Sequence, residues 1–71
     1  MGVINRSAVA KNLRVARAKF GLSQKELAEK SGVCEATISF VESAKHKSIR
    51  MSTLQKLADA LGVPIEEMLA E

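Results

Sequence analysis

The chain has 71 residues, enough for one small domain with a single modest core, and its 46% apolar content excludes disorder by composition. Two Phe and no Trp or Tyr mean that Leu, Ile, Val, Met and Ala must build that core. A single Cys excludes an internal disulfide, no zinc pattern is present, and no segment has the length of a signal peptide or membrane span. We therefore expect one domain over residues 1–71 that is cytoplasmic, binds no cofactor and contacts no membrane.

Charge is distributed unevenly along the chain. Residues 1–56 hold all eleven basic side chains and four acidic ones, a net of +7, whereas the remaining residues hold four acids and no base. A basic segment of this kind suits a phosphate backbone, and an acidic end would be repelled by it. A solvated surface of mixed charge is the alternative explanation, so charge supports a nucleic-acid partner without establishing one.

The apolar spacing predicts five helices and no strand, preceded by a flexible arm at residues 1–6. The first helix spans residues 7–20 and ends at Gly21. Its predicted inward positions are Val9, Leu13, Ala16 and Phe20. The second begins at Ser23, where Ser-Gln-Lys-Glu forms a capping box with Glu26, and ends at Gly32.

The third helix covers roughly residues 34–44, with Ile38 and Val41 pointing inward. The fourth begins at Ser52 with a second capping box, Ser-Thr-Leu-Gln, and ends before Gly62. Its predicted core positions are Leu54, Leu57, Ala58 and Leu61. A short fifth helix follows from Pro64 to residue 69.

The second and third helices are joined by a tight corner. Ala28 allows the two helices to approach closely, and Gly32 supplies the left-handed backbone that the corner needs. Such a corner lets the following helix stand out from the fold and enter a DNA groove. The outward side chains of the third helix are then the candidates for reading bases.

The residues around this corner resemble the phage-repressor family of Cro/CI-type helix-turn-helix proteins. The resemblance rests on GLSQKELAEKSGV, on Ile38, Ser39 and Glu42, and on TLQKLADALGV, and it covers about residues 7–69. It implies a compact, all-α, lambda-repressor-like domain of five helices that binds double-stranded DNA as a homodimer and regulates transcription.

In this family the leading end and outward stripe of the third helix contact bases. The matching positions here are Glu35, Ala36, Thr37, Ser39 and Phe40. Ala36 is small enough to meet a thymine methyl group, and Glu35 can accept from a cytosine amino group or reject other bases. Phe40 is unexpected, because the family places a polar residue there; its ring either meets a thymine methyl or folds back over the core.

Phosphate contacts are expected on both sides of the corner. Gln24 lies in the first turn of the second helix, where free backbone amides face outward, and the family uses a Gln there. Ser23 is a secondary candidate, since capping already explains it. Beyond the third helix, Lys45, Lys47 and Arg50 have the character of a phosphate clamp, with ordinary solvated charge as the alternative.

Arg17 and Glu42 match a pair that links the first and third helices in the family. A partly buried Arg–carboxylate pair holds the third helix at its angle, so we assign both residues a structural role. Two positions depart from the family pattern. Ala44 occupies the place of a Gly, which suggests that the third helix runs on, and Cys34 replaces a capping Ser or Thr.

Two functional classes remain after this reading. The first is a sequence-specific transcriptional regulator, such as a repressor or a restriction–modification-type controller, that binds as a dimer. Its candidate interface is the apolar C-terminal region around Val63, Ile65 and Met68, but these residues also serve as core, and the sequence does not divide the two roles. The second is an antitoxin-like module that binds a partner protein. An enzyme is not expected, and neither is a small-molecule substrate, because Cys34 and His46 lack a third catalytic group and an oxyanion loop.

Overall fold

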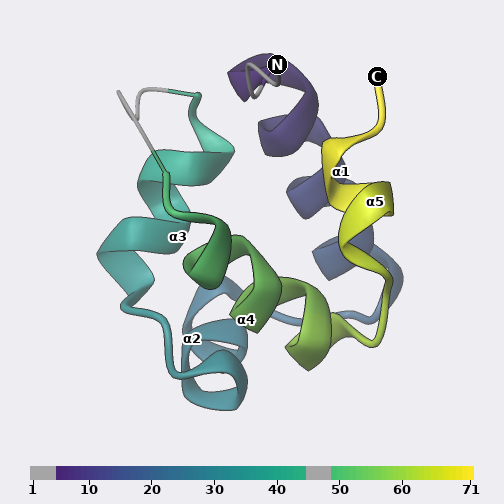
Figure 1. Cartoon of the computed structure of the whole chain (residues 1–71). Helices are drawn as coiled ribbons and strands as arrows, with labels where there is room; N and C mark the ends of the chain where they lie inside the picture. Colours follow the sequence, from purple (N-terminus) through teal and green to yellow (C-terminus); the bar gives the residue numbers. More distant parts are fainter. Residues whose placement is uncertain (1–4, 45–48) are drawn as a thin grey trace.

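The structure is a computed structural model that describes residues 5–44 and 49–71. Within these ranges it contains five helices and no strand (Figure 1). The helices are α1 (Arg6–Lys19), α2 (Gln24–Ser31), α3 (Glu35–Glu42), α4 (Met51–Leu61) and α5 (Ile65–Leu69). The all-α architecture expected from the apolar spacing is therefore confirmed.

All five helices meet around one core. Helix α1 packs against α3 and α5, α2 packs against α3 and α4, and α4 packs against α5 (Figure 1). The core side chains are Val9, Leu13, Leu27, Val33, Ile38, Val41, Leu54, Leu57, Ala58, Leu61 and Met68. Every helix thus contributes apolar surface to the same interior, as a chain of this length requires.

Helix α1 begins earlier than the spacing predicted. Asn5 is its N-terminal cap, and the Asn5 side chain accepts a hydrogen bond from the Ala8 amide at 3.1 Å. The flexible arm predicted at residues 1–6 therefore extended too far, because Asn5 and Arg6 form the start of α1. Residues 1–4 lie outside the described part. Phe20 was also assigned wrongly: its ring is 52% exposed, since the helix ends at Lys19 and the chain turns there.

The capping box predicted at Ser52 is absent. Helix α4 begins at Met51, one residue earlier, and Arg50 occupies the cap position without a side-chain hydrogen bond. Ser52 lies inside the first turn, where its hydroxyl cannot cap the helix. The predicted cap at Ser52 lies two residues beyond the observed cap at Arg50, because a cap is defined by backbone geometry as well as by residue type.

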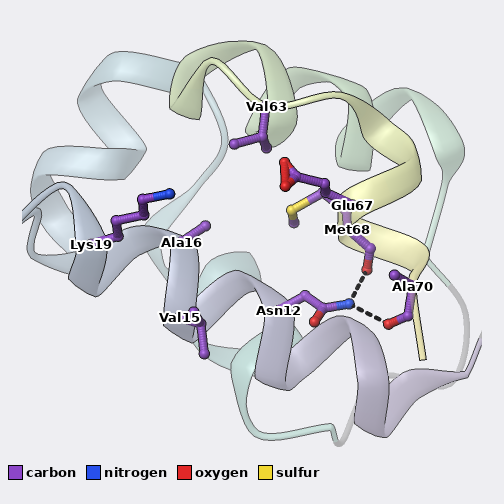
Figure 2. A pocket seen from close by; sticks show the side chains of 8 residues that line it. All are labelled: Asn12, Val15, Ala16, Lys19, Val63, Glu67, Met68 and Ala70. Atoms are coloured by element: carbon purple, nitrogen blue, oxygen red, sulfur yellow. Dashed lines mark hydrogen bonds between the residues drawn. The ribbon is translucent and has the colours of Figure 1, made fainter.

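Helix α5 is held against α1 by one buried side chain and by hydrogen bonds from Asn12. Met68 is only 1% exposed, and the Asn12 side-chain amide donates to the carbonyls of Met68 at 3.0 Å and Ala70 at 2.7 Å (Figure 2). Of the two roles left open for Met68, core and dimer interface, the structure therefore supports the core. Val63 and Ile65 remain partly buried.

Candidate nucleic-acid interface

Helices α2 and α3 form the predicted corner. The Ser23 side chain accepts from the Glu26 amide at 3.0 Å, and the Glu26 carboxylate accepts from the Ser23 amide at 2.8 Å, which completes the capping box at the start of α2. This second hydrogen bond lowers the pKa of Glu26. Gly32 ends the helix with φ +77°, a left-handed conformation that glycine adopts without steric penalty.

Helix α3 has one buried face and one exposed face. Ile38 and Val41 are buried in the core, as predicted. The opposite face carries Glu35, Ala36, Ser39 and Phe40, all exposed, with Thr37 partly buried on the flank. The structure therefore brings all five predicted base-reading residues onto a single helix at the edge of the molecule (Figure 1).

Phe40 does not fold back over the core. Its side chain is 57% exposed, one of the most exposed large apolar residues in the described part of the chain. The core alternative for this ring was therefore wrong. An exposed aromatic ring on an otherwise small and polar face has a cost in water that contact with a partner removes.

The predicted phosphate contacts are placed less uniformly. Ser23 is exposed, but its hydroxyl is engaged in the capping box. The Gln24 side-chain amide donates to Glu42 Oε1 at 3.0 Å, so this side chain links α2 to α3. Arg50 is exposed just before α4. Lys45 and Lys47 lie outside the described residues.

The Arg17–Glu42 pair predicted to link α1 and α3 is present. Arg17 Nε donates to Glu42 Oε2 at 2.6 Å, and Arg17 Nη2 donates to Oε1 at 2.9 Å, so the guanidinium binds the carboxylate in a bidentate manner. Arg17 Nη1 also donates to the Leu22 carbonyl at 2.8 Å. All three guanidinium nitrogens are thus used inside the fold, and the pair ties the end of α3 to α1 and to the turn before α2.

Glu42 is charged in this setting although it is only 5% exposed. Burial acts to raise the pKa of its carboxyl, but the hydrogen bonds from Arg17 and Gln24, with the nearby guanidinium charges, outweigh burial and lower it. The same contact raises the pKa of Arg17. A carboxylate held in this way stabilises the fold as an anion, because losing either partner leaves a buried charge or donor unsatisfied.

Two features of this region were missed from the sequence. The side-chain amide of Gln24, a predicted phosphate contact, donates to Glu42, and the Arg14 guanidinium donates to the main-chain carbonyl of Glu42; neither contact was predicted. A signal for Arg14 existed, because residues three apart on a helix share a face and Arg17 was already assigned to α3.

The end of α3 also differs from the expectation that the helix runs on. It ends at Glu42, and Ala44 takes φ +58°. The left-handed residue that the family pattern provides with Gly is therefore kept, with Ala in its place. At the other end, Cys34 is exposed and makes no side-chain capping hydrogen bond.

The described residues show no group of three His, Cys, Asp or Glu side chains that would hold a metal ion. None of the helices described has the length and apolar character that a membrane crossing requires.

Comparisons with known proteins agree with this geometry. The chain is 39% identical over 64 residues to a hypothetical transcription factor of Neisseria meningitidis serogroup B, covering 90% of this chain and 59% of that protein. It is 38% identical over 64 residues to RghRB of Bacillus subtilis, an uncharacterized HTH-type transcriptional regulator, covering 90% and 46%. The chain thus spans about half the length of these two relatives.

Among solved structures, the fold is similar to the restriction-modification controller protein C.AhdI from Aeromonas hydrophila. The TM-score is 0.83 at 30% sequence identity, and the match covers 89% of this chain and 94% of the controller. The family model HTH_3, described as Helix-turn-helix, matches residues 13–68, which include the corner and all five helices in whole or in part. The chain belongs to this Cro/CI-type helix-turn-helix family.

Proposed function

We propose that the protein is a sequence-specific, double-stranded DNA-binding transcriptional regulator that places α3 in the major groove. The observation that carries the proposal is the exposed face of α3, with Glu35, Ala36, Ser39 and Phe40 outward on a helix whose other face is locked into the core. Base edges in the major groove are read by side chains of this kind on a protruding helix. The names of the relatives as transcriptional regulators support the same function. The proposal assigns the protein no catalytic role and a cytoplasmic location.

Attraction to the phosphate backbone comes from outside α3. The helix carries Glu35 and Glu42 and no basic residue, so it cannot attract DNA by its own charge. We assign that role to Lys45, Lys47 and Arg50 and to the start of α2. There the backbone amides of Gln24 and Lys25 have no partner among the described residues, and the helix dipole favours an anion. Ser23 contributes mainly as the cap that holds those amides in place.

We further assign dimerisation to the face shared by α1 and α5. A groove of about 250 Å³ runs between these helices, with Val15 57% exposed beside it and Val63 in its wall (Figure 2). Lys19 and Glu67 line the same groove. A second copy related by a two-fold axis on this face would cover the exposed apolar surface of Val15 in both chains, since an isologous interface uses the same patch twice. Val15→Asp should shift the protein from dimer to monomer in analytical ultracentrifugation without unfolding it.

Selection from random DNA duplexes tests the DNA proposal, repeated at about 50 mM and 200 mM salt because phosphate contacts weaken steeply over that range. We expect enrichment of a sequence with two related halves about one helical turn apart. Enrichment at neither salt concentration would contradict DNA reading and would favour the antitoxin-like module that binds a protein.

A matched pair of variants tests the role of α3. Glu35 and Glu66 are both exposed carboxylates in the first turn of a helix, α3 and α5 respectively. Glu35→Gln should change which bases are enriched, whereas Glu66→Gln should leave the enriched sequence unchanged. An identical enriched sequence for both variants would remove Glu35 from the base-reading set.

A further inference from the structure

Arg14 holds the end of α3 by its main chain. It lies on α1, and its Nη1 donates to the carbonyl oxygen of Glu42, the last residue of α3 and 28 positions away in the chain. The contact is separate from the side-chain pair of Arg17 and Glu42. Two residues of α1 therefore bind Glu42: Arg17 binds its carboxylate, and Arg14 binds its backbone carbonyl.

The last carbonyls of a helix have no partner within the helix and must find one elsewhere. In α3 the Ser39 carbonyl accepts from the Ser43 amide at 3.0 Å, the Phe40 carbonyl from the Ser43 hydroxyl at 2.9 Å, and the Val41 carbonyl from the Ala44 amide at 3.1 Å. These three are satisfied locally. The Glu42 carbonyl is satisfied by Arg14 alone among the described residues.

The electrostatics favour the same arrangement. The C-terminal end of a helix carries partial negative charge and is stabilised by a nearby cation. Helix α3 has no basic residue in its last turn, and its last residue is itself an acid. Arg14 supplies from α1 the positive charge that α3 lacks.

We propose that Arg14 is a positioning residue for DNA reading, which sets the orientation of α3 through its backbone and does not contact DNA phosphate. The role in reading rests on the proposed function above; the anchoring of α3 does not. Arg17 binds the rotatable side chain of Glu42, whereas Arg14 binds the backbone carbonyl directly. Hydrogen bonds to both the side chain and the backbone of one residue restrict rotation of the helix end more than either bond alone.

The first test needs no DNA. In the Arg14→Ala variant, the amides of Ser43 and Ala44 should exchange with solvent about tenfold faster than in the native chain. The reason is that the charge-assisted hydrogen bond from Arg14 to the neighbouring Glu42 carbonyl is lost. Amides of Leu57 and Leu61 in α4 should keep their protection. Lys11→Ala, which removes a charge from another exposed position of α1, should change neither set. Unchanged exchange at Ser43 and Ala44 in Arg14→Ala would overturn the anchor.

A conservative variant guards against loss of folding. Arg14→Lys keeps the positive charge and a donor, so it should restore most of the protection at Ser43 and Ala44. If Arg14→Ala does not fold, the comparison of Arg14→Lys with Arg14→Gln replaces it, because glutamine keeps a donor without the charge. Equal exchange rates in the native, Lys and Gln forms would contradict the proposal.

The second test separates positioning from phosphate contact. The probes are the duplex enriched from the random pool by the native protein and a duplex of mixed sequence. For Arg14→Ala we expect the ratio of the two affinities to fall about tenfold, with an unchanged dependence of affinity on salt. An equal loss on both duplexes, with the slope of log K against log salt flatter by about 0.9, would show a phosphate contact and overturn the proposal.

DNA reading by the protein and anchoring of α3 by Arg14 can be disproved separately. If the native chain enriches no sequence, the DNA function fails, while the exchange experiment still decides whether Arg14 anchors α3. If the native chain enriches a sequence and Arg14→Ala keeps the affinity ratio, the DNA function stands and the positioning role is wrong.

Discussion

Helices α2 and α3 have the same length, eight residues, and are stabilised in opposite ways. Helix α2 begins on a complete capping box and ends on Gly32, so its two ends are satisfied by residues next to it in sequence. Helix α3 begins at Cys34 without a side-chain cap and is followed by Ala44 at φ +58°. Its N-terminus has no side-chain cap, the carbonyl of its last residue accepts from Arg14 of α1, and the carboxylate of that residue is bonded from α1 and α2.

Helix α3 is therefore ordered mainly by contacts with other helices. The local signals that make α2 a stable helix are absent from α3, and the Glu42 contacts with Arg14, Arg17 and Gln24 take their place. Five predictions test this contrast, in order of decreasing effect.

The largest effect is expected when the tertiary anchor of α3 is removed. Glu42→Ala should lower the free energy of unfolding by about 2 kcal/mol, because it leaves the partly buried Arg17 and Gln24 donors without their acceptor. Urea unfolding measures it. Glu29→Ala, at an exposed position of α2, is the control and should change stability by less than about 0.5 kcal/mol. A similar small change for Glu42→Ala would show that the pair does not hold α3.

Acid should weaken the same anchor in the native chain. The pKa of Glu42 is lowered in the folded state below its ordinary value of 4.5, so its contribution is complete above that pH and is lost as pH falls through the lower folded value. The difference in unfolding free energy between the native chain and Glu42→Gln should therefore shrink from about pH 6 to about pH 3. A constant difference across this range would mean that the charge of Glu42 contributes nothing.

The local cap of α2 should matter less than the anchor of α3. Ser23→Ala removes the hydroxyl that accepts from Glu26 and should lower the free energy of unfolding by about 1 kcal/mol. Ser52→Ala is the matched control, because Ser52 lies inside the first turn of α4 and caps nothing. Thermal unfolding of both variants measures the effect. Equal losses would restore a capping role for Ser52.

The left-handed residue after α3 should respond in the opposite direction. Ala44→Gly should raise the free energy of unfolding by about 0.5 kcal/mol, since glycine removes the steric penalty at φ +58° but loses more freedom on folding. Ala18→Gly, at an exposed position inside α1, should instead lower it by about 1 kcal/mol. Destabilisation by both substitutions would contradict the left-handed conformation of Ala44.

The smallest effect is expected at the uncapped start of α3. Cys34→Ser should stabilise the protein by about 0.3 kcal/mol, because the hydroxyl can accept from an amide that the thiol leaves unbonded. Cys34→Ala removes the thiol without adding a cap and should give no gain. Equal melting temperatures for the two variants would argue against capping as the limit on α3.

Much of the fold was predictable, because it follows from local rules. The capping box at Ser23, the left-handed Gly32 and the buried faces of α3 and α4 all follow from patterns within a few residues. The errors lie where such patterns have more than one solution. Ser52 fits a cap by residue type, yet α4 begins at Met51, and Phe20 fits the apolar spacing although the helix ends before it.

The candidate site likewise has features that were predictable from local patterns and features that were not. Residue spacing placed Glu35, Ala36, Thr37, Ser39 and Phe40 on one helix, and the family resemblance paired Arg17 with Glu42. The partner of Gln24 and the grip of Arg14 on a backbone carbonyl were not predictable, since they depend on how closely α1, α2 and α3 approach. Spacing within a helix says which residues share a face, but not which face of another helix they meet.

Local patterns were enough to predict the helices, their order, most of the core and the family, because caps, turn glycines and apolar periodicity act over short distances. Three facts became visible in the fold alone: Phe40 is exposed, Met68 is interior, and Glu42 joins three helices. Those facts depend on packing between distant segments, and the orientation of the exposed face of α3 depends on them in turn.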